Sequence, residues 1–499
     1  MTRAFNLKII FRTMGALLLF ETLFMAMALG VTLWYGETDT MAFIVSTALT
    51  LVAGLFGLLL GRNASSQVSE REGYVIVASV WLVFSAFGML PYFLSGAIDS
   101  VTDAWFETMS GFTTTGATIM DNVEAQTHGI LFWRALTQWV GGLGIIVLCL
   151  ALLPMFGLGG MQLYAAEMTG VYYEKLSPRI ADTAKKLWGL YIFLTAIEAV
   201  LLHAFGMNIF DAVCQSFSTI ATGGFATFNH SLIDCNPAIQ YTIAFFMLIS
   251  GINFALLIHC LRGKARRLFE DEEARWYIGA VIVCTVVISA GLFIYHYGQL
   301  HDWQIAQFSD SLRCIERSVR NGFFMASSAL TSTGYIISDY TTWPQLLWVV
   351  VFFMMFTGAC SGSTSGGAKW VRILIFIKSG LAEFKRRIHP NAVMPIMLND
   401  RPLGHETISN IMAFMLWYIV IIVISILVFC GCGVQFQDAF GASVSAINNV
   451  GVGIGSFGPL QSWAPFPTLG KWWMTIVMLI GRLEIFTVLL LFTRALWKK

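Results

Sequence analysis

The sequence predicts an all-α polytopic membrane protein: about ten spans, with four repeated span–pore-loop–span units around one pore after an N-terminal hairpin of two transmembrane helices. Three observations lead to this fold class. Of the 499 residues, 57% are hydrophobic and only 12% are charged, which is too apolar for a soluble chain of this length. Apolar runs long enough to cross a bilayer recur along the whole chain. Four related polar segments separate pairs of these runs.

The spans are predicted from apolar runs of roughly 20 residues, the length that crosses the hydrocarbon core of a bilayer. They are expected at residues 13–34, 41–61, 73–95, 131–155, 187–205, 238–261, 276–297, 343–377, 408–432 and 471–495. The eighth run is long and is interrupted between Gly358 and Gly367 by glycine and serine. Polar backbone cannot face lipid at this depth. We therefore expect this segment to unwind below the repeated segments.

The orientation of the chain is predicted from lysine and arginine, which are enriched in cytoplasmic loops. Most of the 30 Lys and Arg residues lie in the two chain ends and in the loops at 62–72, 159–187, 262–275 and 369–401. Residues 96–130, 206–236 and 431–470 contain none. The N- and C-termini are thus expected in the cytoplasm, and the repeated segments open on the external face. Arg313, Arg317 and Arg320 are an exception, interpreted as surface charges of the third short helix.

The repeated segments share one spacing. They run from Asp103 to Gly116, Asp211 to Gly224, Asn321 to Gly334 and Asp438 to Gly451. In each, a serine follows the first residue by seven positions, and the glycine lies six positions further on (Ser110, Ser218, Ser328 and Ser445). Their apolar parts, of about ten residues, are too short to cross a bilayer. Such a segment must enter and return, which is tolerated only inside protein or along an aqueous cavity. Four of them around one axis predict a pore.

The end of each segment is rich in glycine and in small or hydroxylic residues. Rings of backbone carbonyls can replace the hydration shell of a cation where glycine permits the necessary backbone. The expected ion-selectivity filter, which would bind a cation, consists of Thr114, Thr115, Gly116, Ala221, Thr222, Gly223, Thr331, Ser332, Thr333, Gly334, Asn448, Asn449, Val450 and Gly451. In the second segment the serine spacing selects Gly224 but the Thr-Gly pattern selects Gly223, and we favour Gly223.

A short helix is expected to precede each filter run. It would begin near Asp103, Asp211, Asn321 or Asp438, which are residue types that suit a helix N-cap. The C-terminal end of each helix would then point into the pore, and its negative dipole end favours a cation over an anion.

In the four repeated segments with their filter residues, the chain resembles the Trk/Ktr/HKT superfamily of potassium transporters, and within it the Trk type. The likeness extends over nearly the whole length and includes the N-terminal hairpin and the runs Gln138 to Gly144, Gly159 to Tyr164, His389 to Ala392 and Gly481 to Glu484. In the fourth filter segment, Val452 stands where the family usually has proline. The resemblance implies a homodimer of pores in the bacterial inner (plasma) membrane, with potassium as substrate and no bound cofactor. It also implies gating by cytosolic nucleotide-binding regulatory subunits of the Trk A type.

A gate is expected in the interrupted eighth span, where the family has an intramembrane gate loop. The expected gate residues are Gly358, Ser361, Gly362, Ser363, Gly366, Gly367, Lys369 and Arg482. The alternative for this segment is a static helix kink. Arg482 lies within the last expected span, where an ionised arginine marks a pore, a cavity or an ion pair. It is predicted to place a fixed positive charge in the cytoplasmic half of the pore. The alternative is a salt bridge that holds helices together, with Glu198 or Glu484 as partner.

The chain is thus expected to comprise five parts: a transmembrane hairpin at 1–72, a first pore repeat at 73–158, a cytoplasmic loop with the second repeat at 159–274, a third repeat with the gate loop at 275–400, and a fourth repeat at 401–499. The predicted function is potassium uptake. One alternative is a sodium-permeable or sodium- or proton-coupled transporter of the same superfamily. A polytopic membrane enzyme is disfavoured, because the eight histidines are scattered and neither HExxH nor GxSxG occurs. A net charge of +1 argues against binding to nucleic acid.

Overall fold

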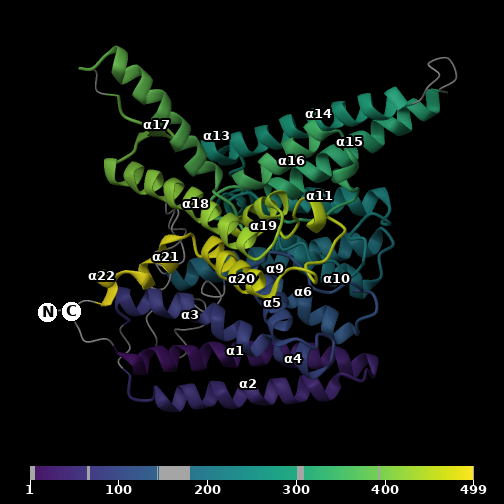
Figure 1. The fold of residues 1–499 in the computed structure, drawn as a ribbon, viewed down its shortest axis with the longest axis vertical. Helices are drawn as coiled ribbons and strands as arrows, with labels where there is room; N and C mark the ends of the chain where they lie inside the picture. Colours follow the sequence, from purple (N-terminus) through teal and green to yellow (C-terminus); the bar gives the residue numbers. More distant parts are fainter. Residues whose placement is uncertain are drawn as a thin grey trace.

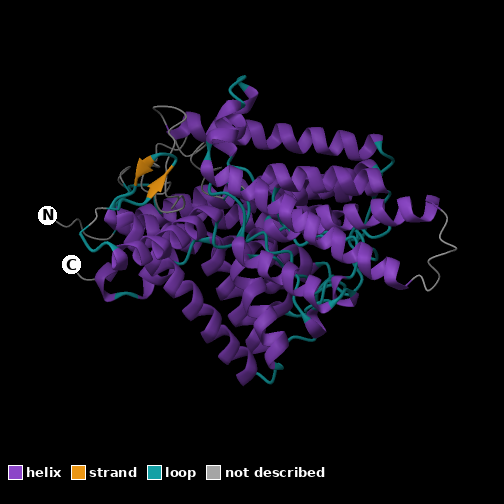
Figure 2. Cartoon of the chain, turned by 90° about the horizontal axis from the view of Figure 1, so that it is seen from above, coloured by secondary structure: helices purple, strands orange, loops and turns teal. Residues whose placement is uncertain are grey.

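The computed structural model describes residues 6–64, 68–142, 144, 180–299, 308–391 and 394–497. Helices and the loops between them make up this structure (Figure 2), apart from one antiparallel pair of two-residue strands, β1 (Met397–Leu398) and β2 (Arg401–Pro402). Six of the described helices are long and apolar enough to cross a membrane, or up to eight if each of two bent helix pairs counts as one span. The motif Gly159 to Tyr164 and residue Ala392 lie outside the described residues.

The N-terminal hairpin consists of α1 (Leu7–Tyr35) and α2 (Thr40–Leu60), which form one layer at the edge of the molecule (Figure 1). The two helices approach closely because glycines meet at their contact. A Cβ atom on Gly15 would overlap the backbone of Gly54 and Leu58. Small residues allow such close packing between helices in a membrane. The left-handed backbone of Gly36, at φ 66°, ends α1 and starts the turn.

In the rest of the chain, four helices lead into the glycine-containing turns (Figure 1), and three of them are only 12 or 13 residues long. Around the first such turn lie α3 (Glu70–Gly88), α4 (Leu90–Leu94), α5 (Val101–Phe112) and α6 (His128–Gly142). Around the second lie α9 (Ile180–Ala204), α10 (Ile209–Ile220), α11 (Pro237–Ser250) and α12 (Phe254–Leu261), followed by the short α13 (Arg266–Glu270).

Around the third turn lie α14 (Glu272–Gln299), α15 (Phe308–Leu330), η2 (Tyr340–Thr342), α16 (Gln345–Thr357) and α17 (Trp370–Ile388). Around the fourth turn lie α18 (His405–Gly431), α19 (Phe436–Asn448), η3 (Gly455–Phe457), α20 (Thr468–Arg482), α21 (Phe486–Leu489), η4 (Leu490–Phe492) and α22 (Arg494–Trp497). The short helices α5, α10 and α19 lie near the centre of the molecule, whereas α1 and α2 lie at one edge and α14 and α15 at the opposite edge (Figure 1).

Two expected spans differ from the straight helices that the sequence predicts. The run at 238–261 is bent by 105° between α11 and α12, and the run at 471–495 is bent by 115° after α20. The first bend falls at residues 251–253, where the side chain of Asn253 accepts a hydrogen bond from the Ala255 amide and caps α12. The second falls at Glu484 and Ile485, which both have positive φ angles. Apolar composition measures the length of a span but not its straightness.

The expected interruption of the eighth span is present. Between α16 and α17 the chain leaves the helix at Gly358 and resumes it only at Trp370. In the fourth expected span, α6 ends at Gly142, and residues 145–155 lie outside the described part of the chain. The bends after α11 and α20 and the non-helical segment after α16 all lie close to the helix ends that lead into the glycine-containing turns, since Gly251, Gly366 and Gly481 contact Thr331, Asn448 and Ile447.

Candidate functional site

The helices that lead into the four turns differ from the prediction at their starts. Asp103, Asp211 and Asp438 lie in the first turn of α5, α10 and α19, whereas the N-cap residues are Ser100, Asn208 and Gln435. The prediction of Asp N-caps is therefore wrong by a few residues. The carboxylates remain near the positive end of the helix dipole, which stabilises them. Asn321 lies inside α15, because this helix runs without a break from Phe308 to Leu330.

The backbone of the four turns is the same. The amides of Thr115, Gly223, Thr333 and Val450 each donate to the carbonyl of the serine five positions earlier, at 2.8, 2.8, 2.9 and 3.0 Å. The residue before each amide is left-handed, with φ between 52° and 58° (Thr114, Thr222, Ser332 and Asn449). The residue after it is a glycine with φ between 80° and 86° (Gly116, Gly224, Gly334 and Gly451). Four segments far apart in the sequence thus adopt one conformation.

This correspondence corrects the register favoured for the second segment. Gly224 is the equivalent of Gly116, Gly334 and Gly451, and Gly223 corresponds to Thr115. The serine spacing selects the right glycine, whereas the Thr-Gly pattern selects its neighbour. The choice depends on which residue has a positive φ, and the local pattern of residue types cannot distinguish two consecutive glycines.

The four turns close into a ring. A Cβ atom on Gly116 would overlap the carbonyl oxygen of Gly223, and one on Gly224 would overlap that of Thr333. In the same way Gly334 faces the carbonyl of Val450, and Gly451 faces that of Thr115. Each segment therefore contacts the next, and the fourth contacts the first. All four glycines line one cavity of about 490 Å³.

The side chains around the ring are oxygen-rich and held by hydrogen bonds. The hydroxyls of Thr113 and Thr115 lie 2.8 Å apart, and those of Thr331 and Thr333 lie 2.7 Å apart. In the fourth segment the Asn449 amide nitrogen donates to the Thr115 hydroxyl at 2.9 Å, which joins it to the first segment. The Asn448 side-chain oxygen accepts from the Tyr418 hydroxyl at 2.7 Å. Carbonyl and hydroxyl oxygens in this arrangement can coordinate a dehydrated cation.

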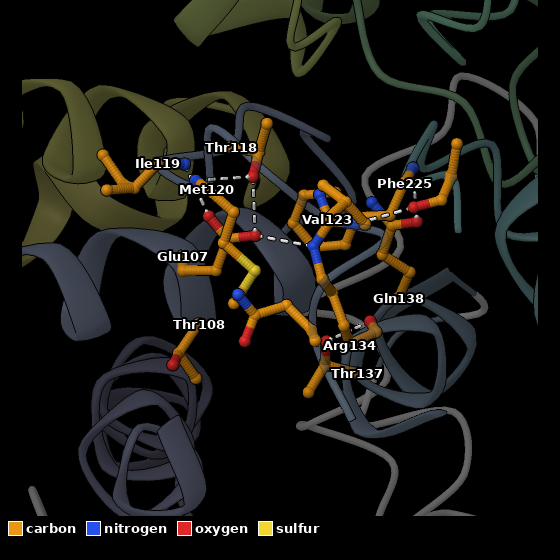
Figure 3. Close-up of polar contacts among 12 residues, drawn as sticks. Glu107, Thr108, Thr118, Ile119, Met120, Val123, Arg134, Thr137, Gln138 and Phe225 are labelled. Atoms are coloured by element: carbon orange, nitrogen blue, oxygen red, sulfur yellow. Dashed lines mark hydrogen bonds and ion pairs between the residues drawn. The ribbon is translucent and has the colours of Figure 1, made fainter. Parts of the chain in front are cut away.

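A buried ion pair lies behind the first and second turns (Figure 3). The Arg134 Nε donates to Glu107 Oε1 at 2.7 Å, and both side chains are buried. The same carboxylate accepts from the Thr118 hydroxyl at 3.0 Å and from the Ile119 amide at 2.7 Å. Arg134 also donates to the carbonyl of Ala226 at 2.8 Å. The pair therefore connects the backbone that follows Gly116 to the backbone that follows Gly224.

The non-helical segment after α16 lies directly below the ring. Its Thr364 hydroxyl donates to the carbonyl of Ile220, the last residue of α10, at 3.0 Å. The amide of Cys360 donates to the Gly251 carbonyl at 3.0 Å. A Cβ atom on Gly366 would overlap the carbonyl of Asn448 at the end of α19. The segment thus contacts the ends of two short helices and the bend between α11 and α12.

Two cationic side chains lie at this segment. The Lys369 ammonium donates to the carbonyl and hydroxyl of Ser365. The Arg482 guanidinium donates to the Thr364 carbonyl at 2.9 Å and to the carbonyls of Gly141 and Gly142, where α6 ends. Arg482 therefore links the segment to the first repeat as well as to α20.

The two carboxylates considered as salt-bridge partners of Arg482 have other surroundings. Glu484 forms an ion pair with Arg372 of α17. Both carboxylate oxygens of Glu198 are buried, with no hydrogen-bond partner in the described part of the chain. Arg482 donates to three backbone carbonyls and also lies over the Trp81 ring, 5.9 Å from its centroid. The carbonyls suit a cation placed among the ends of helices.

Glu273 is a contact residue that the sequence analysis did not identify. Its carboxylate accepts from the Ser361 amide at 2.6 Å, the Ser361 hydroxyl at 2.9 Å and the Val371 amide at 3.1 Å. It therefore fixes both ends of the non-helical segment to the start of α14. A carboxylate just before an apolar span is the signal that points to it, because such a group needs a buried partner.

Comparison with known proteins gives the family. Residues 40–499 match the model of the TrkH family, described as cation transport protein. The chain is 37% identical over 488 residues to the Trk system potassium uptake protein TrkH of Escherichia coli K12, covering 96% of this chain and 92% of that protein. It is 36% identical over 501 residues to the TrkH of Halomonas elongata, covering 99% and 100%. The crystal structure of the potassium transporter TrkH from Vibrio parahaemolyticus superposes with a TM-score of 0.86 at 32% identity, covering 99% of this chain and all of that one.

Proposed function

The chain belongs to the TrkH family of cation transport proteins, and we propose that it takes up potassium through the four turns that end at Gly116, Gly224, Gly334 and Gly451. It is a potassium transport protein of a membrane and not an enzyme, as its relatives are Trk potassium uptake proteins. Potassium is its substrate. The observation that carries the proposal is the closed sequence of contacts between each glycine and the carbonyl of the next turn.

The four turns are proposed to form the selectivity filter. Their shared backbone directs four sets of carbonyl oxygens to one place, where they can replace water around a dehydrated cation. The C-terminal ends of α5, α10, α15 and α19 meet the same place, and their partial negative charge favours a cation. The filter comprises the residues predicted from the sequence, with Gly224 added as the counterpart of Gly116.

The segment from Gly358 to Lys369, together with Arg482, is proposed to be the gate. Its contacts with α10, α19 and the bend after α11 support a position across the pathway below the filter. Glycines at positive φ, Gly358, Gly362 and Gly367, permit rearrangement at modest cost. A static kink does not require hydrogen bonds to several elements. The gate is therefore favoured over the kink.

The remaining proposals concern the setting of the pore. The distribution of lysine and arginine supports cytoplasmic chain ends, and the resemblance to the bacterial Trk proteins supports an inner membrane. The start of α1 and α22 lie at the same end of the molecule, in agreement with this orientation (Figure 1). We further propose cytosolic nucleotide-binding regulatory subunits, since the relatives are named as parts of a Trk system, and a homodimer of pores, as the resemblance to the Trk type implies. We also propose that the chain divides into the N-terminal hairpin and four pore repeats, with the bounds expected from the sequence.

The test is ion flux into liposomes that contain the purified protein, with potassium and sodium compared directly. We expect potassium to be preferred, and the gene to restore growth of a potassium-uptake-deficient strain at low external potassium. Equal fluxes of both ions would instead support the sodium-permeable alternative. Gly224→Ser should reduce the preference, because its side chain would overlap the Thr333 carbonyl. Gly206→Ser is the matched control, since Gly206 also has a positive φ, 99°, but nothing within 4 Å of the added Cβ.

A further inference from the structure

Helix α6 contacts the backbone of the second turn through two side chains one helical turn apart, Arg134 and Gln138 (Figure 3). Gln138 is fully buried. Its Nε2 donates to the carbonyl of Gly223 at 2.6 Å, and its Oε1 accepts from the Phe225 amide at 3.0 Å. Arg134 donates to the Ala226 carbonyl at 2.8 Å. The backbone on both sides of Gly224 is thus held by side chains of the preceding repeat.

The second turn differs from the other three at the position that Gln138 contacts. Thr115, Thr333 and Val450 carry a side chain there, whereas Gly223 has none. A Cβ atom on Gly223 would overlap the carboxamide of Gln138. The glutamine therefore occupies the space that a side chain of the turn fills elsewhere. Two consecutive glycines give this turn more backbone freedom than the others, so it needs an external constraint.

This constraint is specific to the first repeat. Gly141 of α6 and Gly481 of α20 occupy equivalent positions, because a Cβ on either would overlap a carbonyl in the last turn of the adjacent short helix, that of Phe112 or Ile447. The residue three positions before Gly481 is Met478, whose side chain cannot donate a hydrogen bond. Among the described side chains, none donates to the carbonyls of Thr115, Thr333 and Val450.

We propose that Gln138 is a positioning residue that sets the ion selectivity of the pore through the Gly223 carbonyl. This inference rests on the proposed function of the ring as a potassium filter. The Gly223 carbonyl lies against Gly116, so its orientation fixes the spacing between the first and second turns. The bidentate carboxamide prevents rotation of the peptide between Gly223 and Gly224. Without it, the carbonyl can turn away from the ring, and a smaller cation that retains water is no longer excluded.

The test uses Gln138→Met, which keeps an unbranched side chain of similar length but removes both hydrogen bonds. The matched control is Gln240→Met. Gln240 is also buried, lies on α11 and donates to the Leu232 carbonyl at 2.8 Å, away from the ring. Potassium and sodium permeabilities are measured for each protein in liposomes at equal amounts of folded protein. We expect the potassium-to-sodium ratio to fall about tenfold in Gln138→Met, the effect of losing the one hydrogen bond that orients the Gly223 carbonyl, and to stay unchanged in Gln240→Met.

Each outcome decides a separate question. A wild-type protein without preference for potassium overturns the proposed function itself. A selective wild type with an equally selective Gln138→Met overturns the role of Gln138 and leaves the proposed function intact. If Gln138→Met gives no monodisperse protein, Gln138→Glu replaces it, because the carboxylate still accepts from Phe225 but repels the Gly223 carbonyl. Aggregation of both variants assigns Gln138 to folding and also overturns the inference.

Discussion

Replacement of Arg482 tests the proposed gate most directly. The guanidinium donates to the carbonyl of Thr364 in the gate segment and to the carbonyls of Gly141 and Gly142 at the end of α6. It therefore acts in two ways: it holds the segment in place, and it puts a positive charge beside the pathway. Arg482→Ala removes both effects. Arg482→Lys keeps the charge and a donor group, but loses the planar fork of the guanidinium.

The size of the effect follows from these contacts. A hydrogen bond to a charged group contributes about 1.5–3 kcal/mol, so losing the bond to Thr364 raises the population of displaced segment by roughly ten- to a hundredfold. In addition, a positive charge about 4–8 Å from a passing cation, at an effective dielectric constant near 20, opposes it by roughly 2–4 kcal/mol. Both effects act in the same direction. Arg482→Ala should therefore increase potassium flux, and Arg482→Lys should largely preserve the barrier.

The assay is potassium flux into liposomes without regulatory subunits, normalised to folded protein. Arg320→Ala serves as control, since Arg320 forms its ion pair with Glu316 on the same helix, α15. This control loses an arginine without touching the gate segment. The reasoning is refuted if Arg482→Ala is destabilised and shows no gain in flux per molecule. That result would assign Arg482 to architecture, in line with the three helix-end and loop carbonyls that it satisfies.

Three further predictions concern the ring and its surroundings. Gly116→Ser and Gly334→Ser should lower the potassium-to-sodium flux ratio without unfolding the protein, because each added side chain overlaps one carbonyl of the neighbouring turn; unchanged ratios in both would remove these glycines from the filter. Deletion of about four residues between Ser361 and Gly366 should raise basal flux, as expected when a mobile obstruction is shortened, and a folded deletion variant with wild-type flux would contradict the gate. Arg134→Met should destabilise the protein by roughly 3–5 kcal/mol, because it leaves Glu107 buried without its ion partner. Its melting temperature measures this loss, which Glu107→Gln in the same molecule should partly restore; a single variant that melts like the wild type would show that the pair contributes little.

The sequence by itself determined the class of protein and the place of its working parts. Composition and apolar runs predict a helical membrane protein because they depend only on the cost of burying polar groups in lipid. The spacing of serine and glycine identifies the four turns, as each turn needs a glycine at a fixed distance from the end of its helix. The glycine-rich run after Thr357 predicts the break in the eighth span for the same reason.

Only the tertiary structure decided the features that depend on contacts between distant parts of the chain: the glycine of the second turn, the length of α15 and the partners of Arg482. For the second turn the sequence offered two patterns, the serine spacing and the Thr-Gly pair, and the structure decided between them: Gly224 has the positive φ and faces the Thr333 carbonyl, whereas Gly223 faces the side chain of Gln138. Asn321 has a residue type that suits an N-cap, yet it lies inside α15, since packing against α14 continues the helix. The partners of Arg482 come from two other repeats. Such contacts join residues hundreds of positions apart, and no short-range pattern of residue types encodes them.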